Sequence, residues 1–200
     1  VVAVFLLSSC NIGEGKPDNS QQPIFVTRPG SRIALPIKPS NVALADFNTD
    51  GRLDLIVVSE EARTLTVLLA DNSNAQFQAV TAPAITLPES PGEMVLGDVN
   101  GDNRLDVAFD SHDSYNVTLL LGGANGGFSV APNSPIVMKS GQHPHTHGLG
   151  LGDLNGDGKL DLATVNNADN DVSVAFGDGR GGFTLAQRSP FAVGPSPYPL

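Results

Sequence analysis

Three short segments of the chain share one nine-residue pattern, D-x-N-x-D-[GN]-x-L-D, and begin at Asp46, Asp98 and Asp153. Positions 1, 3, 5 and 9 carry oxygen-bearing side chains, position 7 can offer its backbone carbonyl, and position 6 suits a left-handed turn. Oxygen ligands of this kind are typical of Ca²⁺, which binds about six to eight of them, and suit Mg²⁺ less well. The pattern therefore predicts one Ca²⁺ site per segment, with the leucine at position 8 anchoring the loop in the core. The predicted ligands are Asp46, Asn48, Asp50, Arg52 and Asp54; Asp98, Asn100, Asp102, Arg104 and Asp106; and Asp153, Asn155, Asp157, Lys159 and Asp161, with Arg52, Arg104 and Lys159 acting through their backbone carbonyls.

The start of this pattern also occurs in loops of other kinds. An EF-hand needs Glu at position 12 between two helices, whereas position 12 here is Val57, Phe109 or Thr164 within an apolar, β-like stretch. The loop of a dockerin module begins with a similar pattern, but in that module a helix follows the loop. A loop that only turns the chain would not need three copies in one register, so the repetition favours metal binding over a simple turn.

The aspartate segments lie within a longer repeat of about fifty residues, a period typical of propellers and solenoids. Their starts are 52 and 55 residues apart, and 30 or 31 residues after each start an aromatic residue follows a turn, at Phe77, Phe128 and Phe183. Each unit contains four short apolar stretches: one before the aspartate loop, one after it, a third, and a fourth that begins at the phenylalanine. No window shows sustained helical periodicity. The repeat therefore predicts an all-β protein built of β-propeller blades with four antiparallel strands each.

The repeat alignment also accounts for the two ends of the sequence. Residues 24–35 match the fourth stretch of a unit and predict a leading outer strand, and residues 194–200 resemble the approach to a fourth aspartate loop. About three blades and a leading strand do not close a ring. We therefore expect residues 23–200 to be part of a propeller of about seven blades, whose remaining blades belong to the same chain.

The first residues predict a tether rather than a fold. An apolar run over 1–7 and two serines precede Cys10, the sole cysteine of the sequence, and this arrangement resembles the lipobox of bacterial lipoproteins, in which the cysteine is lipidated. We interpret 1–9 as the end of a truncated signal peptide and 10–22 as the lipidated cysteine with a flexible tether. The alternative is a buried free cysteine on a first strand. The lipoprotein interpretation predicts the cell envelope, at the outer surface or in the periplasm, with membrane contact only through the lipid anchor; otherwise we expect a secreted protein.

The repeat units resemble FG-GAP or VCBS-type repeats, the calcium-loop blades of integrin-α-like β-propellers. The strings DLNGDGKLD at 153–161 and GDGRGGF at 177–183 carry the resemblance most specifically, and it extends over residues 24–200. It implies a Ca²⁺ in the first hairpin loop of each blade, at the ligand positions given above, and an extracellular or envelope protein of adhesion and recognition. Asn103 replaces glycine at position 6 of the second loop, and asparagine also adopts positive φ.

A second group of candidate ligands lies between the second and third aspartate loops. His143, His145 and His147 alternate along one segment, so in an extended conformation their imidazoles share one face and could bind Zn²⁺ or Cu²⁺. The alternatives are a contact with a ligand other than a metal, or a polar surface loop that binds nothing. A propeller places this segment opposite the aspartate loops, together with the varied connections between second and third strands, which include Asp110 and His112. That face is the predicted recognition surface.

Charge and missing motifs argue against several functions. The net charge of −10, from 21 acidic and 11 basic residues, leaves no basic patch for nucleic acid. The sequence has no G-x-S-x-G, H-E-x-x-H or Cys–His pairing, and the G-x-G-x-x-G string at 177–182 precedes a strand-like stretch instead of a helix. We therefore predict a non-enzymatic, calcium-binding scaffold that recognises a protein or a glycan. The alternatives are a propeller-type carbohydrate-active enzyme, either a polysaccharide lyase or a hydrolase, and a glycan-binding lectin.

Overall fold

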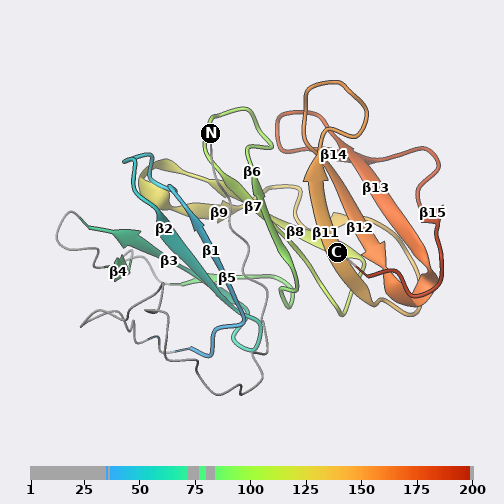
Figure 1. Ribbon diagram of the computed structural model, residues 1–200, viewed down its shortest axis with the longest axis horizontal. Helices are drawn as coiled ribbons and strands as arrows, with labels where there is room; N and C mark the ends of the chain where they lie inside the picture. The colour runs from blue at the N-terminus through green and yellow to red at the C-terminus, as the bar shows by residue number, and fades with distance from the viewer. Residues whose placement is uncertain (1–34, 36, 72–76, 80–83, 199–200) are drawn as a thin grey trace, which may run out of the picture.

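The computed structural model describes residues 35, 37–71, 77–79 and 84–198, which form three antiparallel sheets in succession along the chain (Figure 1). The helices in this part of the chain are two short 3₁₀ turns, η1 (Ala124–Gly126) and η2 (Asn167–Asp169). The all-β prediction is confirmed, as is the prediction of three blade-like units. The strands are β1 (Asn41–Ala45), β2 (Asp54–Ser59), β3 (Thr64–Ala70), β4 (Phe77–Ala79) and β5 (Ile85–Thr86) in the first sheet; β6 (Met94–Gly97), β7 (Asp106–Asp110), β8 (Asn116–Gly122), β9 (Phe128–Val130) and β10 (Ile136–Val137) in the second; and β11 (Thr146–Gly152), β12 (Asp161–Asn166), β13 (Asp171–Gly177), β14 (Phe183–Leu185) and β15 (Phe191–Ala192) in the third.

The fourth strand of each blade is split into two short pieces that pair with opposite ends of the third strand. In the second sheet β6, β7 and β8 lie side by side, and β9 and β10 both pair with β8. Pro135 precedes β10 and has no N–H to donate, and at this break the hydroxyl of Ser134 accepts the N–H of Leu119 at 2.9 Å. Ser189 and Val174 repeat this bond in the third sheet. The first piece begins at the phenylalanine that the repeat predicted, which is Phe77, Phe128 or Phe183.

Two hydrophobic clusters fill the spaces between neighbouring sheets. The cluster between the first and second sheets includes Ile56 and Val58 of β2 and Phe109 of β7, all with no exposed surface. The cluster between the second and third sheets includes Ala108 of β7 and Leu162 of β12. Successive residues of β7 thus face opposite neighbours, as strand geometry requires. The middle sheet is therefore buried on both faces, and Figure 1 shows the three sheets standing side by side as blades do.

The two ends of the sheets carry different chemistry. Each aspartate loop connects the first strand of a sheet to the second, whereas the second-to-third connection lies at the other end of the same sheet. We call the first end the aspartate rim; it consists of residues 46–54, 98–106 and 153–161. We call the other end the opposite rim; it consists of residues 38–40, 60–63, 90, 110–115, 139–148 and 167–171, together with 198.

Side chains at positions 2 and 8 of the aspartate loops pack between blades. Phe47, at position 2 of the first loop, is 4% exposed and meets Phe128 of the second sheet edge to face at 5.7 Å. Its counterpart in the third loop, Leu154, is 56% exposed. At position 8, Leu105 packs into the cluster toward the first sheet, whereas Leu53 is 54% exposed. The expected anchoring of position 8 in the core is therefore wrong for Leu53, because no sheet in the described part of the chain lies on that side.

The three blades do not close a ring within the described residues. The expected leading strand over 24–35 lies, apart from Leu35, outside them, and so do Cys10 and the predicted tether over 10–22. In the described part of the chain no helix has the length and apolar character needed to cross a membrane.

Candidate functional site

The first and third positions of every aspartate loop place a side-chain oxygen against the same backbone nitrogen, that of position 5. In the first loop, Asp50 N lies 3.0 Å from Asp46 Oδ1 and 3.1 Å from Asn48 Oδ1. The same two bonds measure 3.1 and 3.0 Å in the second loop, and 3.2 and 2.8 Å in the third. Because one N–H holds both oxygens, the two oxygens lie close together in all three loops.

The other carboxylate oxygen of position 1 closes the turn at position 6. Asp46 Oδ2 accepts the N–H of Gly51 at 2.8 Å, and the equivalent bonds measure 2.7 and 2.9 Å in the second and third loops. The φ angles of Gly51, Asn103 and Gly158 are 84°, 63° and 82°, so position 6 adopts the predicted left-handed conformation. In the third loop the N–H groups, foremost that of Gly158, lower the pKa of Asp153 and favour its charged form.

Position 7 contributes its side chain to the loop. The backbone N–H of Arg52 donates to Asp50 Oδ1 at 2.9 Å, its guanidinium lies 2.5 Å from Asp50 Oδ2, and its Nε donates to the carbonyl of Ala70 at the end of β3. Arg104 makes the same three kinds of contact, and the Lys159 ammonium lies 3.4 Å from the carboxylate at position 5. The base therefore neutralises the position-5 carboxylate, and in the first two loops it also ties the loop to the third strand.

Position 9 is a buried brace. Asp106 is 1% exposed; its Oδ2 accepts the N–H of Val99 at loop position 2, and its Oδ1 accepts the N–H of Gly122 at the end of β8, at 2.9 and 2.8 Å. Asp54 and Asp161, both with no exposed surface, make the equivalent pair of bonds. Burial raises the pKa of Asp106, and the two N–H donors partly offset that rise. Each of these carboxylates joins its loop to the third strand of the same blade.

The following blade covers the first two loops. The turn after β8 brings Gly126 against the first loop, where an added Cβ would lie 3.6 Å from that of Asn48. The turn after β13 brings Gly181 to the second loop, and its N–H donates to the carbonyl of Val99 at 3.2 Å. In the third loop, residues 153–159 are exposed, whereas Leu160 is half-buried and Asp161 is buried. The loops thus share one internal geometry but differ in how much of the neighbouring blade covers them.

On the opposite rim, three histidines from two blades come together. His112 lies on the connection between β7 and β8, His145 immediately precedes β11, and His147 is the second residue of that strand. The ring centroids are 4.2 Å apart for His145 and His147, 4.6 Å for His112 and His147, and 6.0 Å for His112 and His145. The Nε2 atoms of His145 and His147 are 2.7 Å apart, and the ring of Tyr198 stacks on His147 at 4.8 Å. Burial, followed by the two neighbouring imidazoles, lowers the pKa of His147.

The predicted trio of histidines is brought together only in part. The pair His145 and His147 shares one face as the alternation predicted, but His143 does not join it. His143 precedes β11 and lies beside Tyr115, whose hydroxyl its backbone contacts through a hydrogen bond. Its place is taken by His112 of the preceding blade.

A buried carboxylate links the same segments. Asp110 is 1% exposed, and its two oxygens accept the N–H groups of Glu93, at 2.5 Å, and Gly148, at 3.1 Å. These bonds join the start of the second blade, the end of its β7 and the first strand of the third blade. Burial raises the pKa of Asp110 to about 6.

Lys139 forms a second tie between the second and third blades. Its ammonium lies 2.8 Å from Asp169 Oδ2, 2.5 Å from Asp171 Oδ2 and 5.3 Å from the ring centroid of Tyr115. The hydroxyl of Tyr115 also donates to Asp169. Hydrogen bonds from Lys139 and then Tyr115 lower the pKa of Asp169. Burial acts to lower the pKa of Lys139, but the two carboxylates raise it overall.

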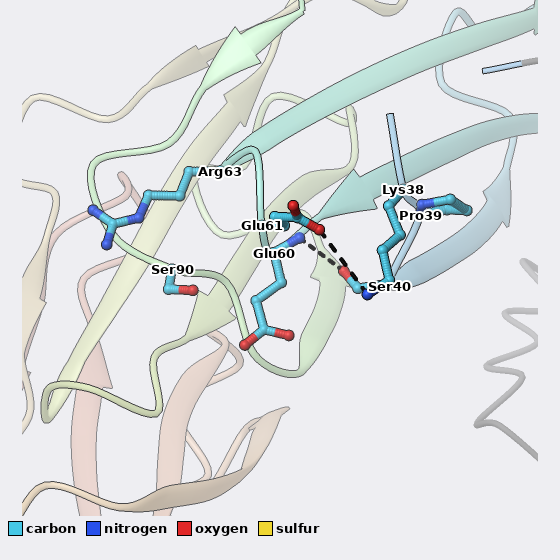
Figure 2. Close-up of a pocket in the computed structure, with 7 residues that line it drawn as sticks. All are labelled: Lys38, Pro39, Ser40, Glu60, Glu61, Arg63 and Ser90. Atoms are coloured by element: carbon cyan, nitrogen blue, oxygen red, sulfur yellow. Dashed lines mark hydrogen bonds and ion pairs between the residues drawn. The ribbon is translucent and has the colours of Figure 1, made fainter. Parts of the chain in front are cut away.

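A pocket of about 340 Å³ opens on the first blade at this rim (Figure 2). Lys38 Nζ lies 4.0 Å from Glu61 Oε2, and the backbone N–H of Glu60 donates to Ser40 Oγ at 3.0 Å. Both side chains of the ion pair are largely exposed, so the pair adds little stability. Figure 2 shows Arg63 pointing away from this pair, so the pocket offers both charge signs. The lining residues are Lys38, Pro39, Ser40, Glu60, Glu61, Arg63 and Ser90.

Residues 46–109, which run from the first aspartate loop through the second and into β7, match the family described as FG-GAP-like repeat. This segment is similar to an FG-GAP-like repeat. The chain is also 27% identical over 131 residues to cartilage acidic protein 1 of Homo sapiens, a match that covers 60% of this chain and 19% of that protein. The Mus musculus and Xenopus tropicalis proteins of the same name are each 28% identical over 131 residues. The chain thus spans about a fifth of the length of the curated relatives it matches.

The three aspartate loops fit a hard cation in donor type. Within residues 37–71 and 84–198, no group of three or more His, Cys, Asp or Glu side chains is arranged as a ready metal site. The carboxylates are held by N–H groups and by the base at position 7, as described above. A carboxylate oxygen that accepts one N–H keeps a further lone pair. Because positions 1 and 3 already hold two oxygens together, the donor set and its register suit Ca²⁺.

Sequence reasoning missed several contributors to these sites. The sequence placed His112 on the same face as the histidine segment, but the predicted trio did not include it. Position 7 also carried a signal, because it is basic in all three loops, as Arg52, Arg104 or Lys159. Lys139 left no signal, since its contacts depend on how two blades pack.

Proposed function

We propose that this protein is a non-catalytic, calcium-stabilised propeller scaffold that recognises a protein or a glycan outside the cytoplasm. The observation that carries the proposal is the contrast between the two rims of the same blades. The three aspartate loops repeat one set of hydrogen bonds, whereas the opposite rim carries different side chains in every blade. A rim repeated in detail serves the stability of each blade, and a rim that varies is suited to selecting a partner.

The aspartate loops would hold one Ca²⁺ each. Positions 1, 3, 5 and 9 would contribute side-chain oxygens and position 7 its backbone carbonyl, at the fifteen residues named above. A bound Ca²⁺ supplies positive charge between carboxylates that repel one another, and three ions would bring the formal charge from −10 to −4. The chain itself orients the ligands, since the shared N–H at Asp50 and its counterparts holds two of them together before any ion arrives.

The opposite rim supports recognition of a polar partner. On the first blade the pocket of about 340 Å³ presents Glu60, Glu61, Lys38 and Arg63. Between the second and third blades the rim presents imidazoles and the phenol of Tyr198, which is 66% exposed. These groups donate and accept hydrogen bonds and offer ring faces, and both are properties that glycans and protein loops use.

The arrangement favours a scaffold over a carbohydrate-active enzyme. Cleavage of a glycan needs a carboxylic acid and a second acid or base that face the same substrate. Asp110 is buried, and both of its oxygens are held by backbone N–H groups. Glu60 and Glu61 lie on the first blade, whereas the histidines gather between the second and third blades. The two acids of the pocket and the three imidazoles therefore lie on different blades.

An extracellular or surface setting is supported by the FG-GAP-like repeat and by the likeness to cartilage acidic protein 1. Within that setting we propose a cell-envelope lipoprotein, anchored by lipid at Cys10 through the tether over 10–22. Metabolic labelling with a fatty acid tests this point, since the label should be lost in Cys10→Ser.

Calorimetry of the full chain with Ca²⁺, with Mg²⁺ and with EGTA tests the calcium part of the proposal. We expect Ca²⁺ to raise Tm well above the value in EGTA and Mg²⁺ to raise it less, and equal values in Ca²⁺ and EGTA would refute it. A glycan array and a panel of cell-surface proteins test recognition. Binding without cleavage supports the scaffold. Release of new reducing ends or unsaturated sugars from a bound glycan would instead refute the scaffold and support a carbohydrate-active enzyme.

A further inference from the structure

The histidines of the opposite rim are held in place by backbone contacts that cross two blades. The N–H of Gly148, next to His147, donates to Asp110, which lies two residues before His112. The hydroxyl of Thr146, between His145 and His147, donates to the carbonyl of Ser114 on the same β7–β8 connection. These contacts hold the backbone at and beside the three histidines in place. Rotation of the side chains is then the remaining way to change how the imidazoles are arranged.

The imidazole nitrogens themselves face one another. His145 Nε2 and His147 Nε2 are 2.7 Å apart, which requires that at least one of them be unprotonated and act as an acceptor. Two nitrogens bound to one tetrahedral Zn²⁺ at about 2.0–2.1 Å lie about 3.3 Å apart. The two rings therefore need to separate by only about half an ångström for both nitrogens to reach one ion.

A third imidazole stands within reach of this pair. The His112 ring centroid lies 4.6 Å from that of His147 and 6.0 Å from that of His145. His145 is exposed and the other two rings are half-buried, so the group opens to solvent on one side. The ring of Tyr198 covers part of His147, with its hydroxyl 3.5 Å from Nε2. Imidazole nitrogens are the preferred protein ligands of Zn²⁺, Cu²⁺ and Ni²⁺ rather than of Ca²⁺.

We propose that His145 and His147, joined by His112 after rotation of its ring, bind one divalent transition-metal ion of the Zn²⁺ and Cu²⁺ class. The three rings do not yet surround a single point, so the ion completes the site by turning side chains on a fixed backbone. Two or three protein ligands leave open positions on such an ion. Because these positions face solvent on the opposite rim, a carboxylate or hydroxyl of a bound partner can occupy them. The site is separate from the aspartate loops and does not depend on calcium binding.

Isothermal titration with Zn²⁺ tests the proposal on the full chain carrying Cys10→Ser, which removes the competing thiol. Millimolar Ca²⁺ in the buffer keeps the oxygen ligands of the aspartate rim from contributing. We expect one Zn²⁺ per chain, and a loss of affinity of about tenfold or more in His145→Ala, His147→Ala or His112→Ala. His143→Ala is the matched control from the same segment, and we expect its affinity to stay within about twofold of the parent.

The absence of saturable Zn²⁺ binding would overturn the proposal, as would an equal loss of affinity in His143→Ala and His147→Ala. The melting curve of each metal-free variant shows whether it remains folded. If a histidine variant does not fold, electron paramagnetic resonance of Cu²⁺ added to the parent decides the matter. Hyperfine splitting from imidazole nitrogens supports the site, and a spectrum of oxygen ligands alone overturns it.

Discussion

Replacing Asp106 with alanine tests whether position 9 of an aspartate loop is a structural brace independent of any metal. The change leaves the N–H groups of Val99 and Gly122 without their carboxylate acceptor at a site that is 1% exposed. An unpaired buried N–H costs about 1–3 kcal/mol, so the free energy of unfolding should fall by about 2–6 kcal/mol. At about 2–4 °C per kcal/mol for a chain of this size, Tm should fall by at least about 4 °C.

Thermal unfolding followed by circular dichroism in EGTA is the assay, because no calcium effect can contribute there. Asp113→Ala is the control; it removes an exposed carboxylate from the β7–β8 connection and should change stability by less than about 0.5 kcal/mol. Asp106→Asn keeps one acceptor but turns an amide N–H toward the other donor, so we expect it to be destabilised as well. An Asp106→Ala protein that melts like the parent in EGTA, and differs only in Ca²⁺, would refute the brace.

Three further outcomes are expected. Phe47→Ala should cost about 3–5 kcal/mol, whereas Leu154→Ala, at the same loop position, should cost less than about 1 kcal/mol because its side chain is 56% exposed; equal costs in urea unfolding would contradict the inter-blade packing. The pKa of Asp169 is lowered in the folded state, so its contribution is present above the unfolded value of about 3.9 and is lost as pH falls through the lower folded value. The stability advantage of the parent over Asp169→Asn, measured by urea unfolding, should therefore shrink below about pH 4, and an advantage that grows there would contradict the Lys139 contact. Calcium at about ten times its Kd should raise the free energy of unfolding by about 1.4 kcal/mol for each occupied loop. Asp98→Asn removes a ligand of the second loop, so in a calcium titration of Tm the total calcium stabilisation should fall by about the contribution of one loop.

Much of the fold could be predicted because its signals are local. The aspartate loops, the apolar stretches around them and the phenylalanines that open the fourth strands are all short-range features. The strand starts at Phe77, Phe128 and Phe183 follow the sequence pattern to the residue. The left-handed turn at position 6 was equally local, since it depends on the residue that occupies it.

The features that could not be predicted depend on contacts between blades. Whether a position-8 leucine is buried depends on a neighbour, which Leu105 has and Leu53 lacks within the described residues. The alternation of histidines predicted three on one face, but β11 begins at Thr146, and only His145, immediately before the strand, and His147, its second residue, come together. The part played by His112 depends on how the second blade meets the third.

The two rims also differ in how far their side-chain contacts reach. The side-chain hydrogen bonds of each aspartate loop described above stay within one blade, as for Asp106 and Gly122, and the bond that reaches the second loop from the next blade, from Gly181 to Val99, joins two backbone groups. Those of the opposite rim cross between blades, from Asp110 to Gly148 and from Lys139 to Asp169. Changes in separate aspartate loops should therefore add independently, whereas changes on the opposite rim should couple neighbouring blades. A partner or ion bound there would consequently act on the junction between two blades, which is where the histidines lie.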